Sequence, residues 1–248
     1  MEEIDELIPH PDKTGRLSLT HRAWAQLDSV VWTFGKELIE LDVSFNNLEF
    51  LPPELGDLLL LRSLNLSCNK LDALPVEIGK CTRLKVLKVN GNYLEALPSE
   101  IGKCILLEEL IVSENKIAEL PVSLAGLQGL HILNAANNCL TSIPYQLGAV
   151  ESLEMIDLAG NKDLDMVPAG MRSDTAMMMW LFNLHKAHAE DMQGLEKLNA
   201  RLEARTQQIE ESKLRMEEDI RKLEEKKRLL LKERPAAYLA LKAFLFRK

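Results

Sequence analysis

The sequence has only four cysteines, and no secretion signal is visible at its start. Cys68, Cys81, Cys104 and Cys139 are widely spread and form no Cys-x-x-Cys pair or metal-ligand spacing. This pattern predicts reduced thiols rather than disulfides or a zinc site. The opening segment MEEIDELIPHPDKTG is acidic and lacks the basic and apolar regions of a signal peptide. We therefore expect a cytoplasmic protein.

Groups that could perform catalysis are also missing. No nucleophile stands beside a base, and no pair of catalytic carboxylates stands out. The stretch IGKCT resembles a phosphate-binding loop, but Leu74 stands where such a loop needs glycine and Cys81 where it needs Ser or Thr. His185, His188 and Asp191 share one face of an expected helix without a fourth metal ligand. We therefore expect a protein that is not an enzyme and holds no cofactor or metal.

A repeat of 23 residues organises more than half of the chain. Six segments, starting at Leu38, Leu61, Leu84, Leu107, Leu130 and Leu153, begin with the pattern L-x-x-L-x-L-x-x-N or a close variant. Apolar residues at the fourth and sixth positions alternate as in a strand with one buried face. One unit cannot bury that face alone, so the units must stack into a solenoid.

The ninth position of every unit is asparagine, and we expect these residues to form a structural ladder. An inward asparagine offers two amide donors and one carbonyl acceptor, so it can satisfy backbone groups where each coil leaves its strand. Replacing one should cost about 1 to 3 kcal/mol through unpaired buried groups. The six residues are Asn46, Asn69, Asn92, Asn115, Asn138 and Asn161.

The second half of each unit carries a proline, which suits an extended return or the first turn of an outer helix. These prolines occupy positions 52, 75, 98, 121 and 144, and Pro168 falls one place late in the sixth unit. The sequence thus predicts an acidic tail at 1–14, a degenerate capping repeat at 15–37 with Trp24, Trp32 and Phe34, and six repeats at 38–172. A capping helix at 173–193, a charged helix or coiled coil at 194–234 and an apolar, basic tail at 235–248 would follow.

At these residues the chain resembles the intracellular leucine-rich repeat proteins of the 23-residue class, which includes the Ras-suppressor, Scribble-type and plant intracellular Ras-group proteins. The resemblance covers residues 38–172. It implies an α/β fold, namely a leucine-rich repeat solenoid with a curved parallel sheet on its concave side. It also implies that the concave sheet binds another protein, often in small-GTPase or phosphatase signalling, although it does not name the partner.

Charge is missing from one long stretch of these repeats. Residues 120–150 contain no Asp, Glu, Lys or Arg, although 27% of the chain is charged. Two prolines and three asparagines exclude a membrane span, which requires roughly 20 predominantly apolar residues in one helix. The solenoid core explains the leucines of the stretch. It does not explain why the positions expected to be exposed are also uncharged: Ser123, Gln128, Asn134, Thr141 and Gln146.

Positions three and five of each unit should point away from the core onto the concave sheet, because successive side chains of a strand alternate between faces. Units three to six place Val86, Ile111, Ile132 and Met155 there, and we expect these four to form a continuous apolar track. Glu109, Glu114, Glu154 and Asp157 would flank the track. An apolar centre with an acidic rim is typical of a protein-binding site. A tolerant surface with drifting residues is the alternative.

After the repeats the sequence predicts helix. Ser173 is expected to cap a helix whose first turns contain Met177, Met178, Met179, Trp180 and Phe182. These turns fit a cap over the last repeat, and a methionine-rich binding surface is the alternative. Further along, one apolar residue recurs every seven positions: Leu195, Leu202, Ile209, Met216, Leu223 and Leu230.

This single stripe is half of a coiled-coil seam, because the positions three further on are mostly polar or charged. It could contact a partner helix, pair weakly with its own copy, or lie on a largely solvated arm. The last stretch, residues 221–248, holds 10 basic and 3 acidic residues and ends in AAYLALKAFLFRK. Such a tail suits a membrane surface or an apolar groove.

The sequence therefore predicts a non-enzymatic scaffold or adaptor that binds a protein on its concave face. The alternative is an assembly component of cytoskeleton, cilium or membrane periphery that acts through the helix and the tail. An excess of acidic residues, 38 against 30 Lys and Arg, is a poor match to nucleic acid.

Overall fold

The computed structural model describes residues 8–165, 167–233 and 242–243. The chain divides into two compact units, Met1–Ala187 and His188–Lys248. The first unit holds the repeats, and the second consists of most of one long helix. The expected tail at 235–248 lies outside the described residues, apart from positions 242 and 243.

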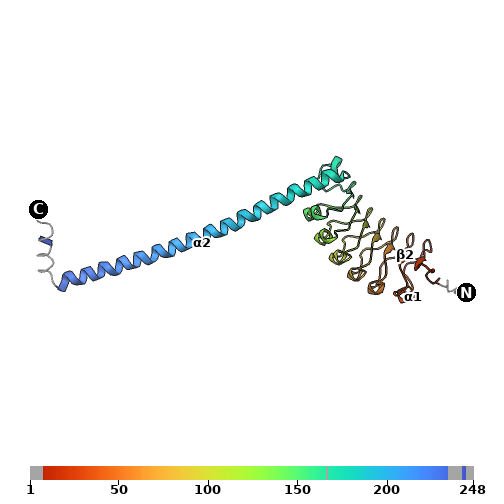
Figure 1. The fold of residues 1–248 in the computed structure, drawn as a ribbon, viewed down its shortest axis with the longest axis horizontal. Coiled ribbons are helices and arrows are strands. Elements are labelled where there is room, and N and C mark those ends of the chain that lie inside the picture. The colour runs from red at the N-terminus through yellow and green to blue at the C-terminus, as the bar shows by residue number, and fades with distance from the viewer. Residues whose placement is uncertain (1–7, 166, 234–241, 244–248) are drawn as a thin grey trace. The chain divides into compact units, whose positions relative to one another are not determined.

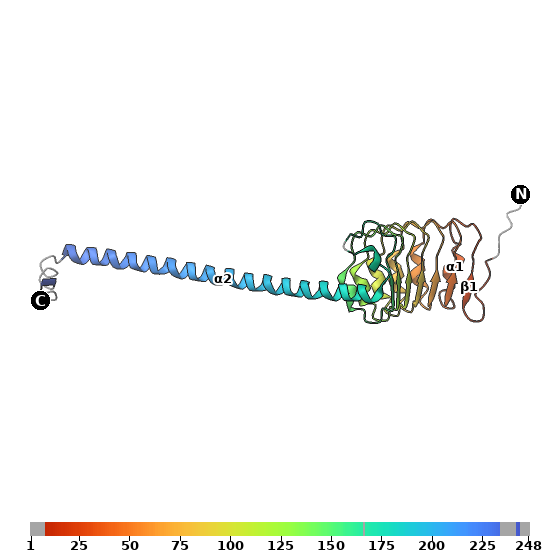
Figure 2. The same cartoon turned by 90° about the horizontal axis from the view of Figure 1, so that it is seen from above.

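One parallel sheet forms one side of the first unit, and its seven strands follow one another in chain order (Figures 1 and 2). Each strand is three residues long, because the fourth and sixth positions of each repeat lock only this short segment against the core. The strands are β1 (Arg16–Ser18), β2 (Glu40–Asp42), β3 (Ser63–Asn65), β4 (Val86–Lys88), β5 (Glu109–Ile111), β6 (Ile132–Asn134) and β7 (Met155–Asp157).

Short 3-10 helices form the opposite side, and each begins after a proline in an extended conformation. Proline has no backbone N–H and so cannot donate a hydrogen bond within a helix. Each helix therefore begins only after the proline. The α-helix α1 (Val30–Thr33) holds the equivalent place in the capping unit. The 3-10 helices are η1 (Pro53–Asp57), η2 (Val76–Lys80), η3 (Ser99–Lys103), η4 (Val122–Gly126), η5 (Tyr145–Ala149) and η6 (Ala169–Met171).

The core between the two sides is a continuous stack of aliphatic side chains. The central residue of each strand from β2 to β7 is Leu or Ile and is at most 2% exposed. Neighbouring coils approach closely on the helical side. A Cβ added at Gly79 would lie 2.7 Å from the carbonyl oxygen of Glu100, so a larger residue there would push two repeats apart. Burial of this continuous core, rather than any single repeat, stabilises the fold.

The asparagine at position nine of each repeat joins neighbouring coils. Asn115 is typical: its Nδ2 donates to the carbonyl oxygens of Val112 and Ser113 in its own coil and of Val89 in the preceding one, at 3.0 to 3.1 Å. Its Oδ1 accepts from the backbone N–H of Leu94 at 3.0 Å. All six asparagines are buried. Each therefore satisfies backbone groups that have no partner in a ladder of strands.

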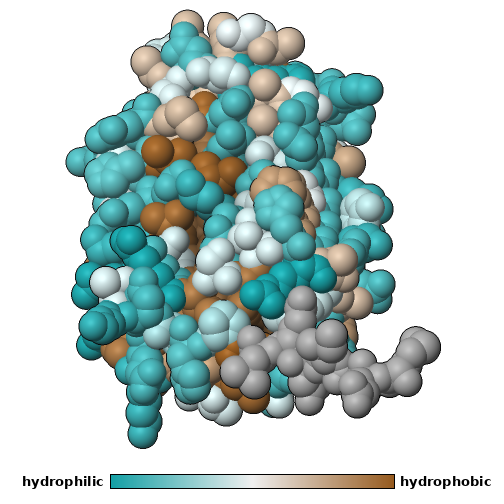
Figure 3. All heavy atoms as spheres, turned by 90° about the vertical axis from the view of Figure 1, so that its right-hand side faces the viewer, coloured by the Kyte–Doolittle hydropathy of each residue, from teal (hydrophilic) through white to brown (hydrophobic). Residues whose placement is uncertain are grey.

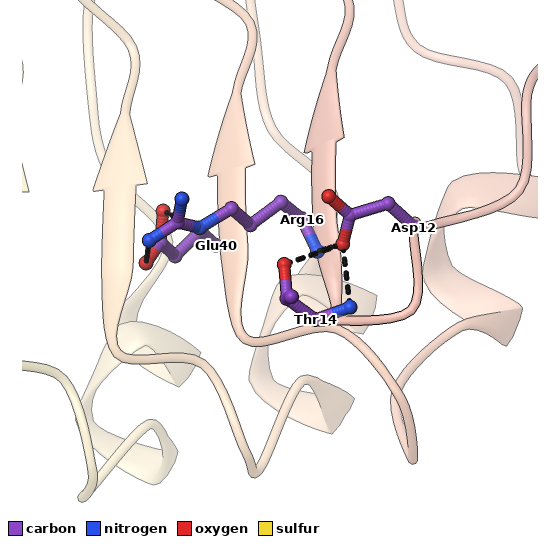
Figure 4. A network of polar contacts seen from close by, with 4 residues as sticks. All are labelled: Asp12, Thr14, Arg16 and Glu40. Carbon is purple, nitrogen blue, oxygen red and sulfur yellow. Dashed lines mark hydrogen bonds and ion pairs between the residues drawn. The ribbon is translucent and has the colours of Figure 1, made fainter.

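The first edge of the sheet is covered by a turn at Asp12 (Figure 4). Oδ1 of Asp12 accepts hydrogen bonds from the Thr14 hydroxyl at 2.6 Å and from the backbone N–H of Arg16 at 3.0 Å. These donors lower the pKa of the Asp12 carboxyl, the Thr14 hydroxyl most of all. The guanidinium of Arg16 crosses to β2 and pairs with Glu40 at 2.9 Å. The open edge of β1 thus has a local partner for its backbone.

The strand of the capping repeat, β1, pairs with β2 at a longer offset than the later strands do. Leu17 pairs with Leu41, an offset of 24 residues, whereas Leu41 pairs with Leu64 at an offset of 23. Trp32 and Phe34 are buried in the core, and Trp24 packs against it partly buried.

On the side of the molecule seen in Figure 3, hydrophilic residues cover most of the surface and hydrophobic residues show between them.

The last edge of the sheet is covered by the segment that leads into the long helix α2 (Thr175–Glu233). The backbone N–H of Ile156 donates to Oγ1 of Thr175 at 3.0 Å, and the N–H of Leu158 donates to the carbonyl oxygen of Arg172 at 2.8 Å. The Arg172 guanidinium donates to the carbonyl oxygens of Asn161, Leu164 and Val167. Thr175 and Arg172 together therefore bond backbone groups at the last edge that no further repeat covers.

The expected capping role of Ser173 was wrong. Its hydroxyl donates to Oδ1 of Asp157 at 2.7 Å, so it binds the last strand. The residue that caps α2 is Asp174, whose Oδ1 accepts from the backbone N–H of Met177 at 3.0 Å. Aspartate at this position also complements the positive end of the helix dipole.

Helix α2 runs without a break through Gly194, so one continuous helix spans residues of both expected segments, 173–193 and 194–234. Its first turns pack on the repeats through Met178 and Phe182, which are 0% and 3% exposed. Residues 190–229 are all exposed. Within the described residues, no helix is both long and apolar enough to cross a membrane.

Candidate protein-binding surface

The concave face, defined by positions three and five of the repeats, is built by strand alternation. In each strand the middle residue is buried and its two neighbours point outward. The register then sets which outward residues are adjacent: position three pairs with position three of the next strand, and position five with position five. Strands about 4.8 Å apart bring paired side chains into contact.

The first half of this face, over β1 to β4, is polar and internally satisfied. Nδ2 of Asn65 donates to Oδ2 of Asp42 at 3.1 Å, and the Ser67 hydroxyl donates to the Oδ1 atoms of Asn65 and Asn90. A hollow of about 310 Å³ lies here, lined by Arg16, Leu17, Ser18, Glu40, Leu41, Asp42, Ser63, Asn65 and Lys88. Its charged groups already have partners, so it offers hydrogen-bonding capacity rather than an unpaired charge.

The second half carries the expected apolar residues, but they do not form a straight track of directly paired side chains. Ile132 on β6 pairs directly with Met155 on β7, whereas the position next to Ile132 on β5 is Glu109. Ile111 pairs with Asn134 and so meets Ile132 only diagonally. Val86 pairs with Glu109 and so also meets Ile111 only diagonally. Because Ile111 occupies position five and the other three occupy position three, the four residues do not stand in one straight row. We call Ile111, Ile132 and Met155 the apolar patch.

The exposure of the patch also differs from the expectation. Ile111 and Ile132 are half-buried, and Met155 is 41% exposed. Short neighbours widen the access to this half, because Ala136 and Ala159 occupy position seven where earlier repeats carry serine or asparagine. The patch is therefore a shallow apolar surface formed by three side chains from three strands.

The four acidic residues expected to flank the patch have different surroundings. Glu109 lies within the face and pairs with Lys88 at 3.2 Å, and Glu154 lies 3.5 Å from Nδ1 of His131. Asp157 accepts from Ser173 and from the backbone N–H of Ala159, so it belongs to the end cap. Glu114 is exposed beyond the end of β5. They form no common acidic rim.

The charge-free stretch includes the middle strand of this half of the sheet, β6. Residues 120–150 include β6, η4 and η5, and neither of these helices has an acidic residue in its first turn, whereas η1, η2 and η3 each have one. The loss of charge therefore extends from the concave face round to the helical side. A surface that excludes charge on both sides favours contact with another protein over free solvation.

A row of strained residues beside the concave face was missed by the sequence reading. Position eight of each repeat has a positive φ, although four of the six residues there are not glycine: Phe45, Cys68, Glu114 and Asn137. The ring of Phe45 stacks on that of His21 at 4.6 Å. Glycine at the same position in two repeats, Gly91 and Gly160, was the signal that could have revealed the left-handed turn.

Two of the cysteines are buried thiols. Burial raises the pKa of Cys81 to about 11 and that of Cys104 to about 12. Their Sγ atoms contact the carbonyl oxygens of Leu55 and Ile78 at 3.5 and 3.3 Å. Cys139 is exposed, and Cys68 is half-buried. Within the described part of the chain, no three His, Cys, Asp or Glu residues lie close enough together to hold a metal ion.

The four thiols should therefore differ sharply in reactivity. Since the thiolate is the nucleophile, Cys81 and Cys104 should stay unmodified by a disulfide reagent at mildly alkaline pH, while Cys139 reacts quickly. Titration of native protein against protein unfolded in guanidinium measures the difference, and Cys139→Ser should remove the fast phase. Four equally fast thiols in the native protein would contradict the buried positions.

Comparisons with known proteins agree with this architecture. Residues 36–94 match the family model described as Leucine rich repeat. A leucine-rich repeat protein of Leptospira interrogans is 29% identical over 60% of this chain and 43% of its own, with a TM-score of 0.50. The leucine-rich repeat ectodomain of the receptor kinase GASSHO1/SCHENGEN3 from Arabidopsis thaliana, in complex with CASPARIAN STRIP INTEGRITY FACTOR 2, is 34% identical over 51% of this chain and 16% of its own, with a TM-score of 0.48.

A PEPR1–AtPEP1 structure is also 34% identical, over 52% of this chain and 19% of its own, with a TM-score of 0.48. The chain spans less than half the length of each of these proteins. No curated protein sequence matches it. The matched family model, the repeat and the likeness to the Leptospira structure show that this chain carries a leucine-rich repeat domain, which a long helix follows.

Proposed function

We propose that the chain is a non-enzymatic scaffold that binds a protein partner through the apolar patch on β5, β6 and β7. The observation that carries the proposal is the contrast within one sheet. Hydrogen bonds and ion pairs satisfy the polar half internally, whereas Ile111, Ile132 and Met155 present apolar atoms to solvent. The concave surface of a solenoid is a preformed binding site, because stacking fixes the strands before any partner arrives.

The patch suits an apolar anchor residue from the partner, and the polar hollow suits the hydrogen-bonding residues beside it. Such a division between an apolar centre and polar surroundings is typical of protein interfaces. The free cysteines fit a reducing, cytoplasmic compartment. Signalling through a small GTPase or a phosphatase is the finer form of the proposal that the resemblance supports.

Substitution of the patch tests the proposal. Ile111→Glu with Ile132→Glu should weaken binding of a purified partner by about 2 kcal/mol, or roughly 30-fold, if these are the central contacts. Because both side chains are half-buried, we expect a loss of about 1 kcal/mol in the free energy of unfolding for each substitution, too little to unfold the domain. Partners would first be captured on the full-length protein and then measured one at a time by calorimetry.

The matched control places the same charges on the opposite side. Val76 and Val122 are more than half exposed in η2 and η4, so Val76→Glu with Val122→Glu adds the same charge to the helical side of the domain. This control should leave binding unchanged. If the patch variant folds normally and binds as tightly as the control, the concave face is not the binding site.

A second function, as an assembly component that acts through α2, is favoured by the exposure of residues 190–229. A partner that remains bound to the patch variant but not to a chain shortened at residue 189 would support it.

A further inference from the structure

Helix α2 presents a second column of positions beside the apolar stripe. Because the helix is unbroken, the residues four positions after the stripe lie on the same face, completing the alternating spacing of three and four that a heptad requires. The stripe Leu195, Leu202, Ile209, Met216, Leu223 and Leu230 then occupies the d positions, and the side chain of Leu230 lies outside the described residues. The a positions are Met192, Asn199, Thr206, Lys213, Ile220 and Lys227.

This face is exposed and locally hollow. Ile209 and Met216 are 63% and 65% exposed, and Ile220 is 56% exposed. A shallow groove follows the same face between Arg205 and Ile220, because the small side chain of Ser212 lies between larger neighbours. Apolar residues that remain uncovered over several helical turns predict a partner helix, which would fill such grooves with its own side chains.

A column of glutamates borders the stripe. The residue directly after each of the first five stripe positions, heptad position e, is glutamate: Glu196, Glu203, Glu210, Glu217 and Glu224. All five are exposed, and within the described residues the ion pairs on this part of the helix involve only Glu218, Asp219 and Lys222. In a two-stranded coiled coil, position e faces position g of the partner helix.

A second copy of the chain matches this column poorly. In a parallel pair, Asp191 would face Glu196 and Asp219 would face Glu224, and Lys213 would face its own copy at an a position. The pair Arg205 and Glu210 is favourable, so repulsive contacts outnumber attractive ones. An antiparallel pair would set the glutamate column against itself. Like charges at facing e and g positions repel each other at short range beside the apolar seam. They therefore disfavour a second copy of this chain as the partner.

We propose that α2 forms a parallel two-stranded coiled coil with a helix of a different protein. That helix carries an apolar seam, Lys or Arg at the positions that face the five glutamates, and acidic or apolar residues opposite Lys213 and Lys227. Asn199 fixes the register by pairing with a polar residue at the matching position, since a single buried asparagine specifies register and two strands. The partner is therefore a basic-flanked helix, and the surface it binds is separate from the apolar patch.

Two synthetic helical peptides test the charge rule with the full-length chain. Both have Leu at the seam, Asn opposite Asn199 and Glu opposite Lys213 and Lys227; they differ only in carrying five Lys or five Glu residues opposite the glutamate column. Fluorescence anisotropy should show the lysine peptide binding at least about 10-fold tighter, because several weak ion pairs act together. The difference should shrink as salt is added.

Charge-reversal variants separate this surface from general attraction. Glu203→Lys, Glu210→Lys and Glu217→Lys together should reverse the preference between the two peptides. The matched control, Glu211→Lys, Glu218→Lys and Glu225→Lys, makes three changes of the same kind at heptad position f, and should keep the preference for the lysine peptide. Circular dichroism should show equal helicity for both variants.

Three outcomes would overturn the proposal. The first is equal affinity for the two peptides, and the second is an equal loss of affinity for the lysine peptide in both triple variants. The third is a tight dimer of the unmodified chain in sedimentation. The last would show that the chain selects its own copy despite the glutamate column.

Discussion

Phe182→Ala should lower the free energy of unfolding of the repeat domain by about 3 to 5 kcal/mol, the usual cost of emptying an aromatic site in a core. Phe182 is 3% exposed and lies against the last repeats. A Cβ added at Gly148 would lie only 2.7 Å from the Cβ of Phe182, so α2 packs closely on the backbone of η5 at this residue. Urea denaturation followed by circular dichroism measures the loss.

Trp180→Ala is the matched control, because it removes a larger aromatic side chain from the same helix. Trp180 is 58% exposed, so its removal should cost less than about 1 kcal/mol. Gly148→Ala should also destabilise the domain, through its clash with Phe182. Equal losses for Phe182→Ala and Trp180→Ala would show that α2 does not seal the solenoid.

Asn115→Ala should destabilise the domain by about 2 to 4 kcal/mol, although it removes a polar side chain. The substitution leaves the backbone N–H of Leu94 and the carbonyl oxygens of Val89, Val112 and Ser113 without their partner. Buried groups left unpaired cost about 1 to 3 kcal/mol each, and relaxation of the loop recovers part of this loss. Thermal and urea unfolding of purified protein measure the effect.

Asn134→Ala is the control for this prediction. Asn134 lies on the concave face, is half-buried and accepts one hydrogen bond, from the backbone N–H of Ala136 at 3.1 Å. Its removal should cost no more than about 1 kcal/mol, because water can replace the side chain. If the two substitutions lowered the free energy of unfolding equally, the hydrogen bonds between coils would not explain why asparagine recurs at position nine of every repeat.

These two sites act at different places in the solenoid. The asparagines join each coil to the one before it, whereas Phe182 and Arg172 close the last coil. Since each repeat contacts only its neighbours, damage at the end should allow local fraying, and damage in the middle should split the array. Either would move the strands that carry the apolar patch.

The repeat pattern was sufficient to predict the solenoid, because its chemistry recurs at a fixed spacing. Leucines at positions four and six, proline before the outer segment and asparagine at position nine each make a local structural demand, and six copies make the same demand in register. The parallel sheet follows from those demands. The apolar character of the later concave positions was also visible in the sequence, because strand alternation assigns each residue a face.

The tertiary structure decided which side chains from different elements lie next to one another. Ile111 lies diagonally across from both Val86 and Ile132, and this arrangement depends on strand register, which joins residues 23 positions apart. The choice between Trp180 and Phe182 as the buried ring, and between Ser173 and Asp174 as the helix cap, depends on the contacts that the start of α2 makes with the last repeat. A sequence pattern determines which face a side chain takes within its own element, whereas contacts between elements arise only when the whole array is stacked.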